Sequence, residues 1–234
     1  DILDLSKIEA DKLETERIAC SPRNVVADVK SLMSVRSEAK GLPLNFEYIG
    51  AIPETVISDP TRLRQILINL IGNAIKFTES GSVRLEVRLV GDSETGHHLK
   101  FDVIDTGIGL TAKRASSLFQ PFTQADTSTA RKFGGTGLGL TISKRLAAML
   151  GGDITVTSEP GKGSTFSVTV ETGPLEGVRL TEGASELPAM EKQVGKTPSD
   201  RQIQLNCRIL LAEDGPDNRR LISFVLKKAG ADVS

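Results

Sequence analysis

The stretch DPTRLRQILINLIGNAIKFT, residues 59–78, has the clearest helical pattern in the chain. Asp59-Pro60 marks its start, and Thr78 to Gly81 mark its end. At about 100° per residue, the apolar side chains share one arc: Leu63, Leu67, Leu70, Ile71, Ala74 and Ile75. On the other side, polar side chains fall within about 40° of a single line, namely Arg62, Gln65, Asn69, Asn73 and Lys76.

This polar face has two interpretations. A solvated face of an amphipathic helix is the simpler one, and geometry alone favours it. Asn69 and Asn73 count against it, because asparagine is a poor helix former and a plain solvent face would favour Glu, Lys or Arg. A carboxamide oxygen can instead bind a hard cation such as Mg²⁺, whose remaining ligands would be phosphates and water.

Two alternating segments follow and predict a β-hairpin. The segment VRLEVRLV, residues 83–90, places one set of apolar side chains on one face: Val83, Leu85, Val87 and Leu89. The segment LKFDVID, residues 99–105, does the same with Leu99, Phe101 and Val103. Two more strands, DITVTS and STFSVTVET, are expected after the helix that ends near Met149-Leu150.

Asp105 continues the inward face of its strand, where a carboxylate without a partner is costly. It is either a cap for the turn that begins at Thr106 or an acceptor for a ligand amino group. Gly107 and Gly109 would let the backbone pass close to such a ligand.

A second glycine-rich segment, FGGTGLGL at residues 133–140, precedes a helix. Its backbone N–H groups and the positive end of the helix dipole suit a phosphate, although a flexible hinge is an equal alternative. It lacks the GKS or GKT of a Walker A motif. It also does not follow a strand, as a dinucleotide fingerprint must.

Together these motifs resemble the ATP-binding catalytic domain of sensor histidine kinases, a member of the GHKL superfamily. DPTRLRQILINLIGNAIKFT resembles the N box and VIDTGIGL the G1 box. LFQPFTQAD resembles the F box, FGGTGLGLTISKRL the G2 box and GKGSTF the last glycine box. The five motifs stand in the family's order.

The resemblance implies an α+β fold, a two-layer α/β sandwich whose mixed sheet carries helices on one face and binds ATP between the layers. Asn73 would be the Mg²⁺ ligand, with Asn69 and Lys76 along the phosphates and Asp105 accepting from the adenine amino group. Other expected contacts to the nucleotide come from Gly107, Gly109, Gly135, Thr136, Gly137, Leu138, Gly139 and Thr165. Residues 119–133 would form a lid that is mobile without nucleotide.

The chain is expected to contain four parts. Residues 1–16 resemble the end of a dimerisation helix, and residues 17–173 form the catalytic domain. Residues 174–206 lack periodicity and are expected to be a linker. Residues 207–234 resemble the truncated start of a receiver domain, with Glu213 and Asp214 as its acidic Mg²⁺ pair. The parent protein would then be a hybrid kinase.

Composition argues against several other classes of protein. The formal net charge is −1 over 234 residues, so no overall field attracts nucleic acid or an anionic membrane. No apolar run spans a bilayer, and we expect a cytoplasmic fragment. Cys20 and Cys207 are expected to be free thiols.

The family mechanism moves the γ-phosphoryl of Mg-ATP to a histidine on the dimerisation domain of the homodimeric kinase, before phosphorelay to a receiver. His97 and His98 are the only histidines and are expected in a polar hairpin turn. The fragment should therefore bind ATP without autophosphorylation. Two alternatives are a GHKL-type ATPase and a nucleotide-free pseudokinase scaffold. In the related ATPases a glutamate activates water one turn before the metal-binding asparagine, where this chain has Asn69.

Overall fold

The computed structural model describes residues 6, 10, 13–92, 96–120, 137–182, 207–209, 226–227 and 230–233. The chain divides into two compact units, residues 1–188 and 189–234. In the second unit, strand β10 (Arg208–Ile209) pairs in parallel with β11 (Asp232–Val233). Glu213 and Asp214, the expected acidic pair of a receiver domain, lie outside the described residues.

The first unit is built on a mixed five-stranded sheet with the order β2-β5-β6-β8-β7. Strand β2 runs parallel to β5, and the remaining neighbours are antiparallel. The strands span β2 Leu44–Ile49, β5 Val83–Asp92, β6 Gly96–Asp105, β7 Ile154–Glu159 and β8 Gly163–Glu171. The β5–β6 pairing confirms the predicted hairpin.

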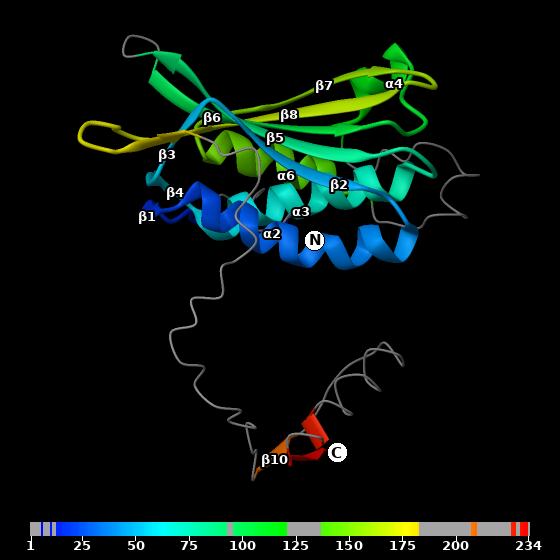
Figure 1. Cartoon of the computed structure of the whole chain (residues 1–234), viewed down its shortest axis with the longest axis horizontal. Helices are drawn as coiled ribbons and strands as arrows, with labels where there is room; N and C mark the ends of the chain where they lie inside the picture. The colour runs from blue at the N-terminus through cyan, green and yellow to red at the C-terminus, as the bar shows by residue number, and fades with distance from the viewer. Residues whose placement is uncertain are drawn as a thin grey trace. The chain divides into compact units, whose positions relative to one another are not determined.

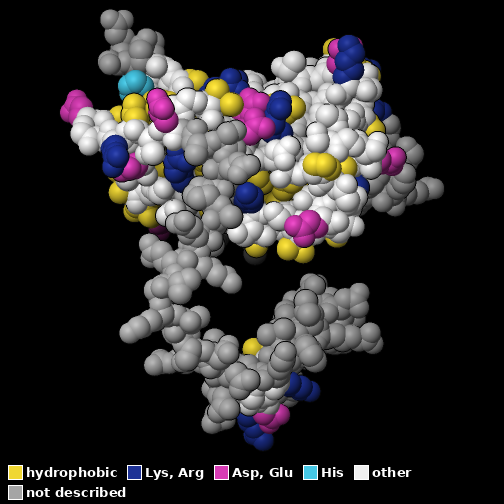
Figure 2. Space-filling model, in the orientation of Figure 1, with side chains coloured by type: hydrophobic (Ala, Val, Ile, Leu, Met, Phe, Trp, Pro, Cys, Tyr) yellow, Lys and Arg dark blue, Asp and Glu magenta, His cyan; other side chains and the backbone are white. Residues whose placement is uncertain are grey.

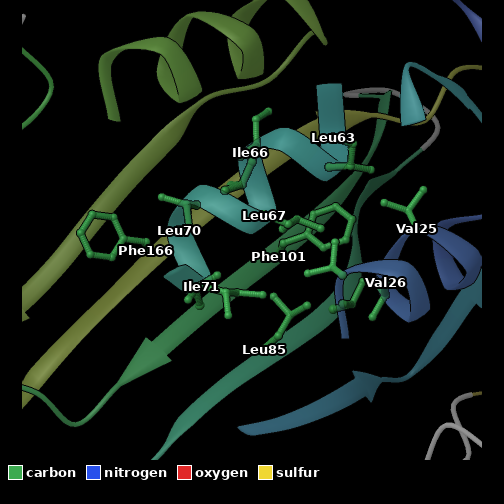
Figure 3. Packing of buried hydrophobic residues seen from close by; sticks show 14 of the residues in the cluster. Val25, Val26, Leu63, Ile66, Leu67, Leu70, Ile71, Leu85, Phe101 and Phe166 are labelled. Carbon is green, nitrogen blue, oxygen red and sulfur yellow. The ribbon is translucent and has the colours of Figure 1, made fainter. Parts of the chain in front are cut away.

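Helices α2 (Pro22–Lys40), α3 (Pro60–Phe77) and α6 (Gly139–Met149) cover one face of this sheet (Figure 1). The apolar arc of α3 lies at the centre of the core. Figure 3 shows it packed against the sheet and α2 through Leu63, Ile66, Leu67, Leu70, Ile71, Leu85, Phe101, Phe166, Val25 and Val26. These side chains are at most 8% exposed. The predicted two-layer α/β sandwich is therefore confirmed.

Helix α3 is secured at both ends by side chains. At its start, Asp59 Oδ1 accepts hydrogen bonds of 3.0 Å from the backbone N–H groups of Thr61 and Arg62. At its end, Lys40 Nζ donates to the carbonyl oxygens of Ile75 at 2.6 Å and Lys76 at 2.9 Å. Otherwise unpaired backbone groups at the helix ends gain partners, so the polar face of α3 is held on a rigid element.

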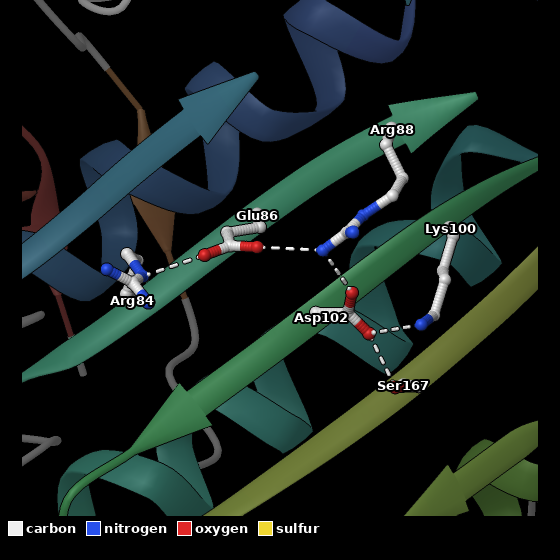
Figure 4. A network of polar contacts seen from close by, with 6 residues as sticks. All are labelled: Arg84, Glu86, Arg88, Lys100, Asp102 and Ser167. Atoms are coloured by element: carbon white, nitrogen blue, oxygen red, sulfur yellow. Dashed lines mark hydrogen bonds and ion pairs between the residues drawn. The ribbon is translucent and has the colours of Figure 1, made fainter. Parts of the chain in front are cut away.

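The open face of the sheet carries a network of charged side chains (Figure 4). Asp102 is 3% exposed, and its carboxylate lies 2.7 Å from Arg88 and 3.2 Å from Lys100. Arg88 also pairs with Glu86 at 2.7 Å. Acidic and basic side chains are interspersed over the molecular face drawn in Figure 2. Among the described residues, no helix is long and apolar enough to cross a membrane.

Short strands complete the first unit, and one of them differs from the expectation of a linker after residue 173. Strand β1 (Ile18–Cys20) pairs with β4 (Val56–Ser58), and β3 (Ala51–Pro53) pairs with β9 (Leu180–Glu182). The segment before β9 also bonds to the domain, since Glu54 N–H donates to the carbonyl of Arg179 at 2.9 Å. Three residues are too few to show a period of two, which explains why the sequence pattern indicated no strand.

The structure also corrects the expected position of the histidines. His97 and His98 lie within β6, paired with Gly91 and Val90, because the strand ladder continues beyond the apolar alternation. The Nε2 atom of His98 lies 3.2 Å from the carbonyl oxygen of Gly151. Both imidazoles are partly buried, on a strand that pairs with β5 and β8.

Candidate functional site

The polar line of α3 faces the start of α6. Asn69 Nδ2 donates a 2.8 Å hydrogen bond to Ser143 Oγ on α6, and Asn73 Nδ2 lies 3.5 Å from Asn69 Oδ1. Gly139 makes this approach possible, because a Cβ there would lie 2.6 Å from Asn69 Oδ1. Asn69 therefore lies between α3 and α6, and Asn73 lies beside it on α3. The contact of Asn69 with α6 differs from the fully solvated polar face of the simpler interpretation.

Lys76 lies one turn further along α3, near the end of the helix. Its ammonium nitrogen is 5.1 Å from the ring centre of Phe77, within the range of a cation–π contact. The side chain is partly buried. A cation at this position can neutralise negative charge on a ligand beside Asn73.

Asp105 ends β6 on the same face as the core, as its alternation predicts, and is 6% exposed. Its Oδ1 accepts a 2.8 Å hydrogen bond from the N–H of Gly107. Burial raises the pKa of this carboxyl, while hydrogen bonds from Gly107 and Ser164 oppose the shift. A buried carboxylate held in this way is a strong acceptor for an N–H group of a ligand.

The loop after Asp105 passes close to neighbouring backbone. A Cβ at Gly107 would lie 2.5 Å from the carbonyl oxygen of Phe77, and one at Gly109 would overlap the carbonyl of Glu159. Gly109 also has a φ of 63°. A side chain at either position would displace the loop, so both glycines are needed for its path.

Ser158 joins three parts of this region and has no signal of its own in the sequence. Its hydroxyl accepts a 2.8 Å bond from the N–H of Leu110 and lies 2.9 Å from both the Gly163 carbonyl oxygen and Ser164 Oγ. Ser164 in turn bonds to Asp105. The loop, the last glycine box and the carboxylate are thus connected by hydroxyl groups.

The structure places Thr165 on the opposite face of the sheet from Asp105. In the β6–β8 register, Asp105 pairs with Ser164, whereas Thr165 pairs with Ile104. Paired residues share a face and successive residues alternate, so Thr165 points to the open face and Ser164 to the helices. This is at odds with the nucleotide contact expected of Thr165 and favours Ser164 for that contact. The alternation of β8 was visible in the sequence, but the face that meets a ligand was not.

The glycine-rich segment is described in part. Gly137 has a φ of 71°, Leu138 is 1% exposed and Gly139 begins α6. Gly135, Thr136 and the expected lid from residue 121 onward lie outside the described residues. At the described start of the lid, the carbonyl of Phe119 accepts a 3.1 Å hydrogen bond from Thr141 Oγ1.

A metal at this site would depend on carboxamide and phosphate oxygens. Within the described ranges there is no group of three His, Cys, Asp or Glu residues that could hold a metal ion. A carboxamide oxygen from Asn73 is a suitable ligand for Mg²⁺, which usually keeps several waters and binds substrate phosphates. The residues present therefore fit a metal that arrives with a nucleotide.

Comparisons with known proteins point to one family. Residues 58–174, half of the chain, match the family described as "Histidine kinase-, DNA gyrase B-, and HSP90-like ATPase". The chain is 46% identical over 166 residues to the signal transduction histidine-protein kinase BarA of Escherichia coli K12, covering 71% of this chain and 18% of that protein. It is 37% identical over 235 residues to the aerobic respiration control sensor protein ArcB of the same organism, covering 100% and 28%.

A solved structure supports the same fold. The crystal structure of full-length ShkA in complex with AMPPNP matches with a TM-score of 0.62 and 26% identity, over 99% of this chain and 43% of that chain. The chain thus spans less than half of the ShkA chain and less than a third of BarA and ArcB.

Proposed function

This chain belongs to the histidine kinase-, DNA gyrase B- and HSP90-like ATPase family, and on that premise we propose that it binds Mg-ATP and presents the γ-phosphoryl group to a histidine of a dimerisation domain. The observation that carries the proposal is the buried carboxylate of Asp105, held by Gly107 and Ser164 at the end of β6. It lies on the helix-covered face of the sheet, the face toward which α3 presents its apolar arc.

Asp105 would accept a hydrogen bond from the adenine amino group. Its carboxylate already takes hydrogen bonds from the protein, so its orientation is set before the base arrives. Ser164, and not Thr165, would support this contact through its hydroxyl group. Gly107 and Gly109 have no side chain, so the backbone of the loop can pass close to the base.

The phosphates would lie at the other end of the site, beside α3 and the start of α6. Asn73 would hold Mg²⁺, Lys76 would add a positive charge, and the backbone from Gly137 to Gly139 would donate N–H groups at the start of the helix. The metal would neutralise phosphate charge during transfer. Gly135 and Thr136 are expected to extend the same contact.

Phosphoryl transfer is favoured over ATP hydrolysis because of Asn69. A neutral carboxamide does not take a proton from water, and its Nδ2 is already bonded to Ser143. BarA is named a histidine-protein kinase. We therefore propose a role in two-component phosphorelay, with the dimerisation domain and a receiver domain of a homodimeric hybrid kinase as partners, in the cytoplasm.

The test is isothermal titration calorimetry of the chain with ATP and Mg²⁺. We expect Asp105→Asn and Asn73→Ala to weaken binding by about tenfold or more, since each removes a charge-assisted or metal contact. Thr165→Ala is the matched control, because this side chain lies on the open face. Unchanged affinity in both site variants would overturn the proposed site, and absence of binding by the unaltered chain would favour a pseudokinase scaffold.

A second experiment separates transfer from hydrolysis. The chain is incubated with labelled ATP and a separately produced dimerisation domain of the parent kinase. We expect label on that domain, none on the chain itself, and little steady release of phosphate. Turnover near one per second without the second domain would instead support an ATPase.

A further inference from the structure

We propose that Ser143 is a positioning residue for the metal site, and that it acts through Asn69 on the carboxamide of Asn73. The inference rests on the proposed function, because it assumes that Asn73 binds Mg²⁺. It assigns Ser143 a role that its motif does not indicate. It also changes the role expected of Asn69, from a residue along the phosphates to one that orients its neighbour.

Ser143 and Gly139 form one face of α6, a turn apart, and both meet the side chain of Asn69. Ser143 is 2% exposed, and its Oγ accepts the 2.8 Å bond from Asn69 Nδ2. Gly139 lies so close that a Cβ there would be 2.6 Å from Asn69 Oδ1. The carboxamide of Asn69 is therefore confined by α6 at both its nitrogen and its oxygen.

The direction of this carboxamide determines what Asn73 encounters. With Nδ2 bonded to Ser143, Asn69 turns its Oδ1 toward Asn73, whose Nδ2 lies 3.5 Å away. The nitrogen of Asn73 is then directed at Asn69, and its oxygen is directed elsewhere. A reversed Asn69 would present N–H₂ to Asn73 and attract that oxygen, which is the only atom of the group that can bind Mg²⁺.

A purely structural role for Ser143 would have a different signature. Loss of a buried hydrogen bond lowers the stability of the whole domain and affects ATP binding equally with and without metal. A positioning role predicts a selective effect, because only the metal-dependent part of the affinity requires the oxygen of Asn73. The ratio of ATP affinities with Mg²⁺ and with EDTA therefore distinguishes the two roles.

The experiment measures this ratio by calorimetry for the unaltered chain and for Ser143→Ala. We expect the ratio to fall by about tenfold, as for loss of one buried hydrogen bond, while affinity in EDTA stays within about twofold. Ser37→Ala is the matched control, a serine of α2 that is 3% exposed and donates to the carbonyl of Ser34 at 3.0 Å. Ser143→Cys keeps a weak acceptor of similar size, so its ratio should lie between those of the unaltered chain and Ser143→Ala. This variant replaces Ser143→Ala if the alanine variant does not fold.

A second readout needs no nucleotide. In the free protein, the side-chain amide signals of Asn69 and Asn73 in a ¹⁵N NMR spectrum should both move in Ser143→Ala and remain in place in Ser37→Ala. A shift confined to Asn69 would overturn the proposed route to Asn73.

A double variant tests whether Ser143 acts only through Asn69. Once Asn69→Ala has been made, adding Ser143→Ala should lower the Mg²⁺-to-EDTA ratio no further. An additive loss, or an unchanged ratio in folded Ser143→Ala, would overturn the inference. If the unaltered chain itself showed no metal-dependent binding, the proposed function would fail instead, so the two failures are distinguishable.

Discussion

Asp105 is a single residue at which binding and stability make opposite demands. Its carboxylate is buried at the end of β6, and burial raises the pKa of the group. The hydrogen bonds from Gly107 and Ser164 offset part of this cost. Stability alone would favour an uncharged side chain at this position, and a buried carboxylate with a shifted pKa is common at functional sites.

Replacement of Asp105 by asparagine should therefore separate the two demands. The raised pKa means that the folded protein binds more protons than the unfolded chain between the two pKa values, so this group contributes stability at low pH that is lost as pH rises through the folded pKa. We expect nucleotide-free Asp105→Asn to gain thermal stability relative to the unaltered protein at pH 7, and to gain less at pH 4. Thermal unfolding at the two pH values measures this. An equal difference at both would contradict it.

Ser164 and Thr165 are neighbouring hydroxyl residues on opposite faces of β8. Ser164→Ala removes a donor to Asp105 and should weaken ATP binding by about 1–2 kcal/mol. Thr165→Ala should leave the affinity within about twofold, because its side chain points to the open face. Calorimetric titration of both variants checks the assignment, and a larger loss for Thr165→Ala would reverse it.

Helix α3 illustrates how one element is positioned by its neighbours. Its apolar arc fixes it to the sheet, while Asp59 and Lys40 satisfy backbone groups at its two ends. Lys40 is the last residue of α2, so the end of one helix holds the end of the next. This places Asn69, Asn73 and Lys76 on a helix whose position relative to the sheet is well determined.

Lys40→Met should loosen the end of α3. Two hydrogen bonds from an exposed lysine to the Ile75 and Lys76 carbonyls are lost, and their charge is partly screened by water. We expect a loss of about 0.5–1 kcal/mol in the free energy of unfolding, measured by urea denaturation. The same change at Lys113, exposed on α4 (Ala112–Ser117), is the control. Equal effects in the two variants would mean that the contact contributes nothing.

The sequence predicted α3, the β5–β6 hairpin and the face of Asp105, because each depends on local periodicity. It did not predict the partner of Asn69, since Ser143 is 74 residues away and meets it only through helix packing. Ser158 was missed for the same reason. The choice between Ser164 and Thr165 required the register of β8 against β6, which no segment of sequence contains by itself.

The first unit as a whole extends beyond the last strand of its main sheet. After β8, the chain continues to β9, which pairs with β3, a strand more than a hundred residues earlier in the chain. Arg23 at the start of α2 donates to the carbonyl of Thr181 at 3.1 Å, and its guanidinium carbon lies 4.4 Å from the ring centre of Tyr48. Residues 174–182 are therefore part of the folded unit.

Two fragments should differ in stability for this reason. A fragment of residues 13–182 keeps β9, whereas one of residues 13–173 leaves the backbone of β3 without its partner strand. We expect the shorter fragment to unfold at a temperature lower by several degrees, and to be more prone to aggregation through the uncovered edge. Differential scanning calorimetry and light scattering compare them. Equal melting temperatures would show that β9 is dispensable.

Strand β6 has a consequence for the fidelity of folding. It presents Asp102 to the charged network of the open face and Asp105 to the core. A slip of β6 by one residue would exchange these faces, turning Lys100 and Asp102 toward the apolar core and Asp105 toward the open face. On the proposed function, only the correct register would bind ATP, so ATP would stabilise that register over the slipped one by mass action. Binding of the substrate would thus favour the strand register that forms its own binding site.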